Sequence, residues 1–209
     1  MSKFEWRKQC KNIYLPKKQP SFIEIPNMKY FTIEGSGNPD GDLFKINTET
    51  LYSLSYTIRM MPKKGNIPEG YFEYTVFPLE GIWDLDEVGR QLDYIDKDHL
   101  IYKLMIRQPD FVTEELFQTA KHIVSQKKSN LNLERVKFEN LSEGLCVQAM
   151  HIGPYSNEPE TFTLMERFCF EKNLRRIDKT HKEIYLSDPR KTSPNQLKTV
   201  LRFKVKELN

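Results

Sequence analysis

Cysteine is scarce in this sequence, and its few copies lie far apart. Only Cys10, Cys146 and Cys169 occur in 209 residues, and no CxxC motif is present. An odd, widely spaced set argues against a disulfide framework and against a structural zinc site. The four histidines also lack the spacing of a metal motif. We therefore expect no metal and no organic cofactor, and we interpret Cys146 and Cys169 as small buried side chains.

Long apolar runs and a dominant charge are absent as well. No run approaches the roughly 18 apolar residues that a membrane helix needs, and the opening MSKFEW lacks the apolar stretch of a signal peptide. Lys and Arg number 32 against 29 Asp and Glu, which leaves a net charge of +3. So balanced a chain is not typical of a dedicated nucleic-acid binder. We expect a cytoplasmic protein without a membrane or direct nucleic-acid partner.

Phosphate-binding glycine motifs are missing too. The GSGNPDG segment at residues 35–41 contains neither GxGxxG nor GK[ST], so we interpret it as a turn. Aromatic side chains, in contrast, are plentiful, with 13 Phe, 10 Tyr and 2 Trp. Such side chains build hydrophobic cores and ligand pockets alike.

Hydrophobic periodicity predicts a mixture of strands and helices. Strands are expected at residues 22–26, 30–34, 71–77 (continued irregularly to 83), 100–106, 145–152, 183–186 and 199–205. Helices are expected from an N-cap at Asn47 to about residue 62, from Thr113 to about residue 127, and at residues 157–172. The order of strand, loop, helix, strand and strand therefore occurs twice.

This repetition predicts the domain organisation. Residues 1–20, basic and broken by prolines, are interpreted as an N-terminal arm, and residues 21–209 as one domain. Its halves span about 22–107 and about 133–205, with a linker helix at about 113–127. We expect an α+β fold of two β-α-β-β halves with antiparallel sheets. Halves this small are marginal alone, so they are expected to pack together around a cleft.

Four motifs in this order resemble the stand-alone branch of the GyrI-like small-molecule-binding family. They are PLEGIW at residues 78–83, LIYKLMIRQPDFVTEEL at 100–116, HIGPY at 151–155 and EIYLSDPR at 183–190. The likeness extends from about residue 15 to 205. It implies a duplicated fold with a central pocket for amphipathic, aromatic or cationic small molecules. Because few residues precede position 22, we expect this chain to lack the DNA-binding domain of the family's transcription regulators.

Three residues are the candidates for catalysis. Glu183 shares a strand face with Tyr185, and the family resemblance implies that it points into the pocket; the alternative is an exposed carboxylate. Glu80 is the candidate partner of Glu183, or else a surface charge. Tyr155, at the turn before a helix, offers a hydroxyl to a ligand oxygen, or else bonds the local backbone. A buried carboxylate with a raised pKa suits acid–base chemistry.

Four aromatic residues are the candidates for ligand binding. Trp83 lies three residues after Glu80 and offers a stacking and cation–π surface, or else fills the core. Tyr185 shares the face of Glu183. Tyr52 and Tyr56 are four apart on one predicted helix, where they line the pocket or the edge of the core.

Three functions remain open at this point. The resemblance favours a cofactor-independent hydrolase that adds water to electrophiles such as cyclopropane-bearing genotoxins, in a role of bacterial detoxification. The same pocket also suits a protein that binds or sequesters xenobiotics without turnover. The third possibility is a protein-interaction module of the gyrase-inhibitor kind. The oligomeric state is left open. His151, alone on an apolar strand face, is interpreted as a hydrogen-bonded structural residue.

Overall fold

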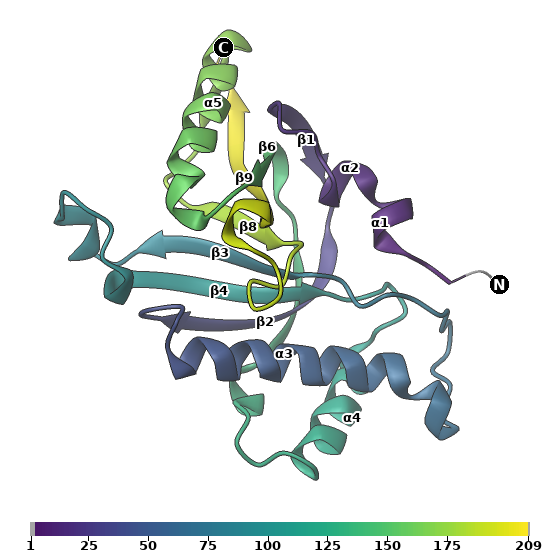
Figure 1. The fold of residues 1–209 in the computed structure, drawn as a ribbon. Coiled ribbons are helices and arrows are strands. Elements are labelled where there is room, and N and C mark those ends of the chain that lie inside the picture. Colours follow the sequence, from purple (N-terminus) through teal and green to yellow (C-terminus); the bar gives the residue numbers. More distant parts are fainter. Residues whose placement is uncertain (1–2, 209) are drawn as a thin grey trace. The chain divides into compact units, whose positions relative to one another are not determined.

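The computed structural model describes residues 3–208 and divides the chain into two compact units. The division does not follow the order of the sequence. One unit, here the α3 unit, is built mainly from Met28–Leu79 and Asp84–Leu141. The other, the α5 unit, combines Trp6–Asn27, Glu80–Trp83 and the chain from Ser142 onward. Figure 1 labels the helices and most of the strands of both units.

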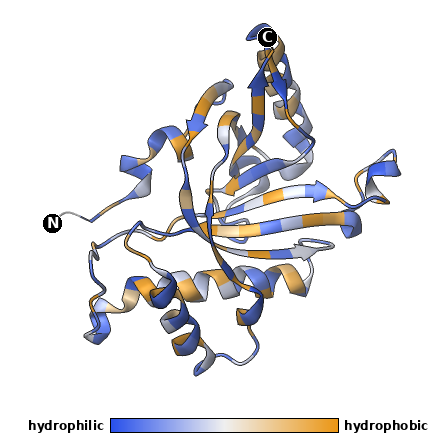
Figure 2. Cartoon of the chain, turned by 180° about the vertical axis from the view of Figure 1, so that it is seen from behind, coloured by the Kyte–Doolittle hydropathy of each residue, from blue (hydrophilic) through white to orange (hydrophobic). Residues whose placement is uncertain are grey.

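The α3 unit is an antiparallel sheet with two helices. Its central strand β2 (Met28–Ser36) pairs with β4 (Leu100–Arg107) and with β5 (Lys137–Leu141). The helix α3 (Asp42–Met60) packs against β2, β4 and the helix α4 (Glu114–Ser125). Figure 2 shows hydrophobic and hydrophilic residues alternating along α3, the pattern of a helix with one buried face. The unit also contains the 3-10 turns η1 (Pro62–Lys64), η2 (Gly89–Gln91), η3 (Lys97–His99) and η4 (Leu133–Arg135).

The structure confirms one of the two helix N-caps predicted in this unit and contradicts the other. Thr113 caps α4 as predicted, because its Oγ1 accepts a hydrogen bond from Leu116 N at 3.2 Å. The predicted N-cap at Asn47 is wrong, since α3 already begins at Asp42. Asn47 is instead buried within the helix, and its Oδ1 accepts a hydrogen bond from Asn132 Nδ2 at 2.8 Å. The first turn of α3 carries Leu43 and Phe44, but Leu43 is exposed, so the apolar pattern is weaker there than along the buried stripe further on.

The predicted strand at residues 71–77 is also wrong. This segment is irregular, and only Tyr74 forms a bridge, with Phe4. Its aromatic side chains pack against one another and against Phe111, with ring centroids 5.4 Å apart for Tyr71 and 5.5 Å for Phe72. Alternating aromatics therefore fill a ring cluster here instead of pairing in a ladder. The regular strand comes later, as β3 (Leu79–Leu85).

The α5 unit is an antiparallel sheet in the order β1-β6-β9-β8-β3, with β7 paired to β9. The strands are β1 (Ser21–Ile25), β6 (Gly144–Ile152), β7 (Leu174–Arg176), β8 (His181–Tyr185) and β9 (Lys198–Glu207). The helix α5 (Glu158–Glu171) covers one face, and the short helices α1 (Trp6–Gln9) and α2 (Lys11–Tyr14) lie on the other (Figure 1). The turns η5 (Tyr155–Asn157) and η6 (Pro194–Gln196) complete the unit.

The two faces of this sheet are packed differently. Under α5 lies an apolar core of Val147, Ala149, Met165, Cys169, Leu174, Leu201, Phe203 and Val205. On the other face, the segment interpreted as an N-terminal arm packs onto the sheet, where Trp6 and Tyr14 are buried with ring centroids 5.3 Å apart.

Within residues 3–208, no helix is both long and apolar enough to cross a membrane.

Candidate binding and catalytic site

Strand register sorts the candidate residues onto the two faces of the α5-unit sheet. In the β3–β8 ladder, Gly81 lies opposite Glu183 and Trp83 opposite His181. Paired residues project to the same side of a sheet, and successive residues alternate. Trp83 and Glu183 therefore share the face covered by α5, whereas Glu80 projects from the opposite face.

A chain of hydrogen bonds holds Glu183 on the α5 face. Trp83 Nε1 donates to Tyr185 Oη at 2.8 Å, which leaves the Tyr185 hydroxyl proton free to bond Glu183. Glu183 Oε1 lies 3.0 Å from His181 Nε2 on its other side. Burial, followed by the nearby Glu183 carboxylate, raises the pKa of Tyr185 well above its ordinary value. Tyr185 is therefore a neutral hydrogen-bond donor. Together with His181, it fixes the orientation of the Glu183 carboxylate.

Tyr155 approaches this group from the turn before α5. Its ring centroid lies 6.2 Å from that of Tyr185, with the rings nearly perpendicular at 87°. Burial, with the charges of Glu183 and Glu158, raises the pKa of Tyr155 to about 12. The phenol is consequently a neutral hydrogen-bond donor at physiological pH. Trp83, Tyr185 and Tyr155 thus place three aromatic groups around one carboxylate.

Glu158, at the first position of α5, is a site residue that the sequence analysis missed. It is only 7% exposed, and within the described chain its Oε1 has no hydrogen-bond partner. Burial, then the charge of Glu183 and a hydrogen bond to it, raises the pKa of Glu158 to about 9. The carboxyl is therefore protonated at neutral pH. A buried polar atom without a partner is rare in folded proteins and often marks a place for water or a ligand.

A periodic signal for Glu158 was present in the sequence. Glu158, Phe162, Met165 and Cys169 recur at helical spacing along the stripe of α5 that faces the sheet. Asn157 followed three residues later by Glu160 is also the polar sequence signature of a helix start. Asn157 makes no capping hydrogen bond through its side chain, and Glu160 is exposed. Extending the apolar stripe backwards by one turn would have shown a carboxyl on its buried face.

His151 connects the sheet to the segment that carries the site. Its Nε2 lies 3.1 Å from the carbonyl oxygen of Pro154, and its Nδ1 lies 2.9 Å from Thr161 Oγ1. A neutral ring with its proton on Nε2 satisfies both contacts, since the threonine hydroxyl then donates to Nδ1. The prediction of a hydrogen-bonded structural histidine is confirmed. His151 orients the turn that bears Tyr155 and the first turn of α5.

Glu80 belongs to a separate buried network on the far face. It is 1% exposed, and its carboxylate lies 3.0 Å from Lys182 Nζ and accepts a hydrogen bond from Tyr14 Oη at 3.2 Å. Lys182 also bonds Glu143 at 2.7 Å, and Arg202 Nη1 lies 3.3 Å from the same carboxylate. Glu80 is therefore neither a surface charge nor on the face that carries Glu183.

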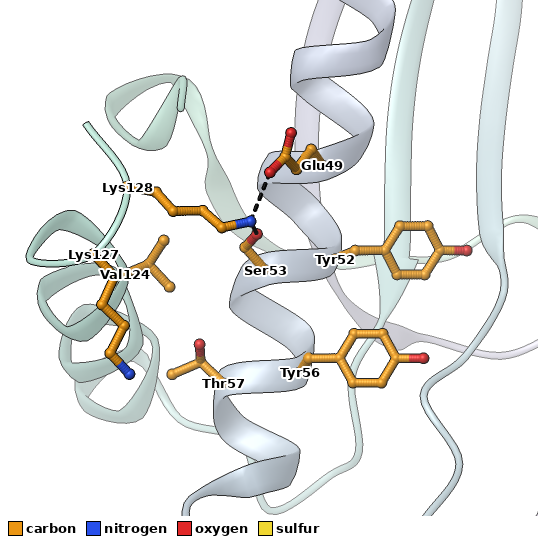
Figure 3. A pocket seen from close by; sticks show the side chains of 8 residues that line it. All are labelled: Glu49, Tyr52, Ser53, Tyr56, Thr57, Val124, Lys127 and Lys128. Atoms are coloured by element: carbon orange, nitrogen blue, oxygen red, sulfur yellow. Dashed lines mark hydrogen bonds and ion pairs between the residues drawn. The ribbon is translucent and has the colours of Figure 1, made fainter. Parts of the chain in front are cut away.

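Tyr52 and Tyr56 lie in the α3 unit, on one side of α3. Their ring centroids are 6.2 Å apart, and both residues line a pocket of about 410 Å³ with parts of α4. Figure 3 shows the two rings pointing away from Lys127 and Lys128, which lie on the other side of this pocket. Glu183, Tyr185, Trp83 and Tyr155 are here called the Glu183 group. The pocket beside Tyr52 and Tyr56 is lined by none of these four residues.

No metal centre is evident in the part of the chain that the structure describes. Between residues 3 and 208, no three His, Cys, Asp or Glu side chains are grouped so that they could hold a metal ion. The polar atoms available at the site are carboxyl, phenol, indole and imidazole groups, which serve acid–base chemistry and hydrogen bonding.

Comparisons with known proteins identify the family. Residues 18–206 match the model of the GyrI-like small molecule binding domain. An uncharacterized conserved protein from Listeria innocua is 39% identical, with a TM-score of 0.91. Two structures named as hydrolases from Listeria innocua are 37% and 38% identical, with TM-scores of 0.89 and 0.91. Each alignment covers 98% of this chain and 100% of the other.

The chain therefore belongs to the GyrI-like small-molecule-binding family, as its four motifs predict. The antiparallel α+β architecture agrees with this assignment, and the predicted fold class is confirmed. A comparison with curated protein sequences finds no match.

Proposed function

We propose that this protein binds amphipathic, aromatic or cationic small molecules at the Glu183 group and hydrolyses reactive electrophiles. Genotoxins that carry a strained cyclopropane are the expected substrates, and their destruction protects the cell. One observation carries the proposal. The α5 face brings together a carboxylate, a neutral phenol and an indole, from Glu183, Tyr155 and Trp83. Within the described residues, no Lys or Arg forms an ion pair with Glu183.

The arrangement suits addition of water to a cyclopropane conjugated with a dienone. Glu183 accepts a proton from water and orients its oxygen toward the least hindered ring carbon. Tyr155 donates a hydrogen bond to the carbonyl oxygen, where negative charge develops as the ring opens. The exposed ring of Tyr155 offers a flat surface to a planar substrate, and the buried Trp83 side chain holds Tyr185 beside it. The reaction needs only water, and its product is the substrate plus one water molecule.

The comparisons support hydrolysis without naming a substrate. The Listeria innocua structures named as hydrolases resemble this chain over nearly its whole length, and the family model describes small-molecule binding. Fold alone does not fix an activity, so the proposal depends on the side chains of the site.

Mass spectrometry of a cyclopropane-bearing alkylator incubated with the protein tests this proposal. We expect a product heavier by one water. We expect Glu183→Gln to reduce turnover by about 10²–10⁴-fold, the usual contribution of general acid–base catalysis, while binding is retained. Glu207→Gln, at an exposed position of β9, is the matched control and should keep full activity. Unchanged compound at stoichiometric protein would contradict hydrolysis.

A binding protein without turnover is the second candidate. Aromatic surfaces beside carboxyls without a Lys or Arg partner attract organic cations by cation–π and charge interactions. The chain has two tryptophans, so Trp6→Phe leaves Trp83 as the only indole reporter. Saturable quenching of Trp83 fluorescence by an aromatic cation, without any hydrolysed product from electrophiles, would favour this function over hydrolysis.

A further inference from the structure

Glu158 is a buried titratable group that the mechanism above does not use. It lies at the start of α5, 7% exposed, with its Oε1 lacking a hydrogen-bond partner among the described residues. The titratable groups that act on it are Glu183 and Tyr185 from β8 and Tyr155 from the preceding turn. None of these is a cation, and the basic group next to the pair is His181, whose Nε2 lies 3.0 Å from Glu183 Oε1. Two adjacent carboxyls without a Lys or Arg partner hold one proton between them, because both cannot be ionised together at low cost.

We propose that Glu158 is a second catalytic residue, which delivers a proton to the substrate oxygen and recovers one from Glu183 after each turnover. This inference rests on the proposed hydrolase function and adds the source of its second proton. The unpartnered Oε1 is the atom that would meet the substrate, and the other side of the carboxyl group faces Glu183.

The proton balance of the reaction closes within this pair. The water oxygen forms a bond to the ring carbon, and the water proton passes to Glu183. The cyclopropane C–C bond breaks, and its electron pair moves through the conjugated ring to the carbonyl oxygen. That oxygen takes the proton of Glu158 and becomes a phenol. Glu183 is now protonated and Glu158 ionised, so one transfer along their hydrogen bond restores the starting state.

Acidity decides between Glu158 and Tyr155 as the proton source. An ordinary phenol has a pKa of about 10. The pKa of Tyr155 is about 12, so transfer of its proton to a phenolate is unfavourable. The pKa of Glu158 is about 9, so transfer from this carboxyl is favourable. Tyr155 therefore stabilises the oxygen by a hydrogen bond, and Glu158 supplies the proton.

The test compares the pH dependence of turnover in wild type, Glu158→Gln and Glu160→Gln. Glu160 lies two residues further along α5 and is exposed, so its variant should match wild type. Wild-type turnover should fall as the pH rises through about 9, as Glu158 loses its proton. Glu158→Gln should be about 100-fold slower and should lose this falling limb. Glu158→Asp, which keeps a carboxyl, should retain the limb at a reduced rate.

Infrared difference spectroscopy supplies a readout that does not depend on substrate. A protonated carboxyl signal should be present at pH 7 and vanish near pH 9 in wild type and Glu160→Gln. It should be missing from folded Glu158→Gln. The inference is overturned if Glu158→Gln keeps the wild-type rate and limb, or if wild type lacks this signal. If the signal titrates as expected but no electrophile is hydrolysed, the proposed function fails and the catalytic role of Glu158 fails with it.

Discussion

The two faces of the α5-unit sheet bury the same type of side chain with opposite consequences. On the α1–α2 face, Glu80 and Glu143 lie within 3.0 Å and 2.7 Å of Lys182 Nζ. On the α5 face, the charge of Glu183 raises the pKa of Glu158, and the described part of the chain provides only His181 as a basic partner of Glu183. One face thus neutralises its carboxylates with cations, and the other neutralises them with a shared proton.

Burial acts to raise the pKa of Glu143 and of Glu158 alike, so the opposite net shifts come from their partners. Burial alone would raise the pKa of Glu143, but Lys182 and Arg202 outweigh it and hold the pKa below its ordinary value. Burial raises the pKa of Glu158 to about 9, and Glu183 adds to this effect. A buried carboxylate surrounded by cations serves as a structural charge. A carboxyl without them is available for proton transfer.

The largest expected effect at neutral pH comes from removing the cation on the α1–α2 face, whose carboxylates are paired with Lys182 and which is here called the compensated face. Lys182→Met removes the cation between two buried carboxylates and leaves Glu80 without an ion pair. An uncompensated buried charge costs about 3–5 kcal/mol, so the free energy of unfolding should fall by that amount. Denaturant titration measures it. Lys198→Met, at an exposed position of β9, should change it by less than about 0.5 kcal/mol. Equal stability of the two variants would show that the network is not a structural necessity.

The α5 face, whose carboxyls have no Lys or Arg partner, should make the stability of the protein depend on pH. In the folded protein Glu158 keeps its proton up to about pH 9, but in the unfolded chain it loses it near pH 4.5. A raised folded pKa means that wild type loses stability as the pH rises through this window. Glu158→Gln cannot ionise, so it should gain stability relative to wild type between pH 5 and 9. We expect the gap to widen by up to about 1.4 kcal/mol per pH unit across this window.

Thermal unfolding from pH 5 to pH 9 measures this difference, and Glu160→Gln provides the baseline. A constant gap between Glu158→Gln and wild type across this range would contradict a shared proton at neutral pH. The result would also weaken the contrast between the two faces.

Much of the fold could be predicted from the sequence, because periodicity reports burial locally. The strands at 100–106, 145–152 and 199–205 match β4, β6 and β9 within a few residues. The errors arise where local pattern and tertiary packing disagree, or where a strand is too short to carry a pattern. The aromatic alternation at 71–77 is that of a strand, but its rings are satisfied by side-chain packing instead of a ladder. The short strands β5 and β7 carry too little apolar pattern to be seen.

The site was less predictable, because it depends on which strands pair and in which register. Glu183 and Trp83 share a face only through the β3–β8 ladder, and the same ladder sends Glu80 to the other side. A shift of one residue would reverse these assignments. No local pattern in the sequence specifies that register. The side-chain stripe that includes Glu158, by contrast, was readable in α5 itself.

Tyr14 tests the compensated face with a smaller change. Its hydroxyl donates to Glu80 at 3.2 Å, and the side chain is fully buried. Tyr14→Phe keeps the ring and removes this donor, so Glu80 loses one hydrogen bond while Lys182 remains. A hydrogen bond to a charged group contributes about 1.5 kcal/mol or somewhat more. Denaturant titration should show a loss of that size, well below that of Lys182→Met. A loss as large as that of Lys182→Met would mean that the hydrogen bond, not the cation, stabilises Glu80.

The smallest expected effect comes from an ion pair that is closer but exposed. Lys128 Nζ lies 2.6 Å from Glu49 Oε1 in the α3 unit, with side chains 45% and 49% exposed (Figure 3). This distance is shorter than the 3.0 Å between Lys182 and Glu80. Water already solvates both exposed charges, so Glu49→Gln should cost only about 0.2–1 kcal/mol and less at high salt. If burial matters more than distance, this shorter ion pair should contribute less stability than the longer one. Comparing the unfolding free energies of Glu49→Gln and Lys182→Met therefore separates the effect of burial from that of distance. A loss near 3 kcal/mol for Glu49→Gln would overturn that separation.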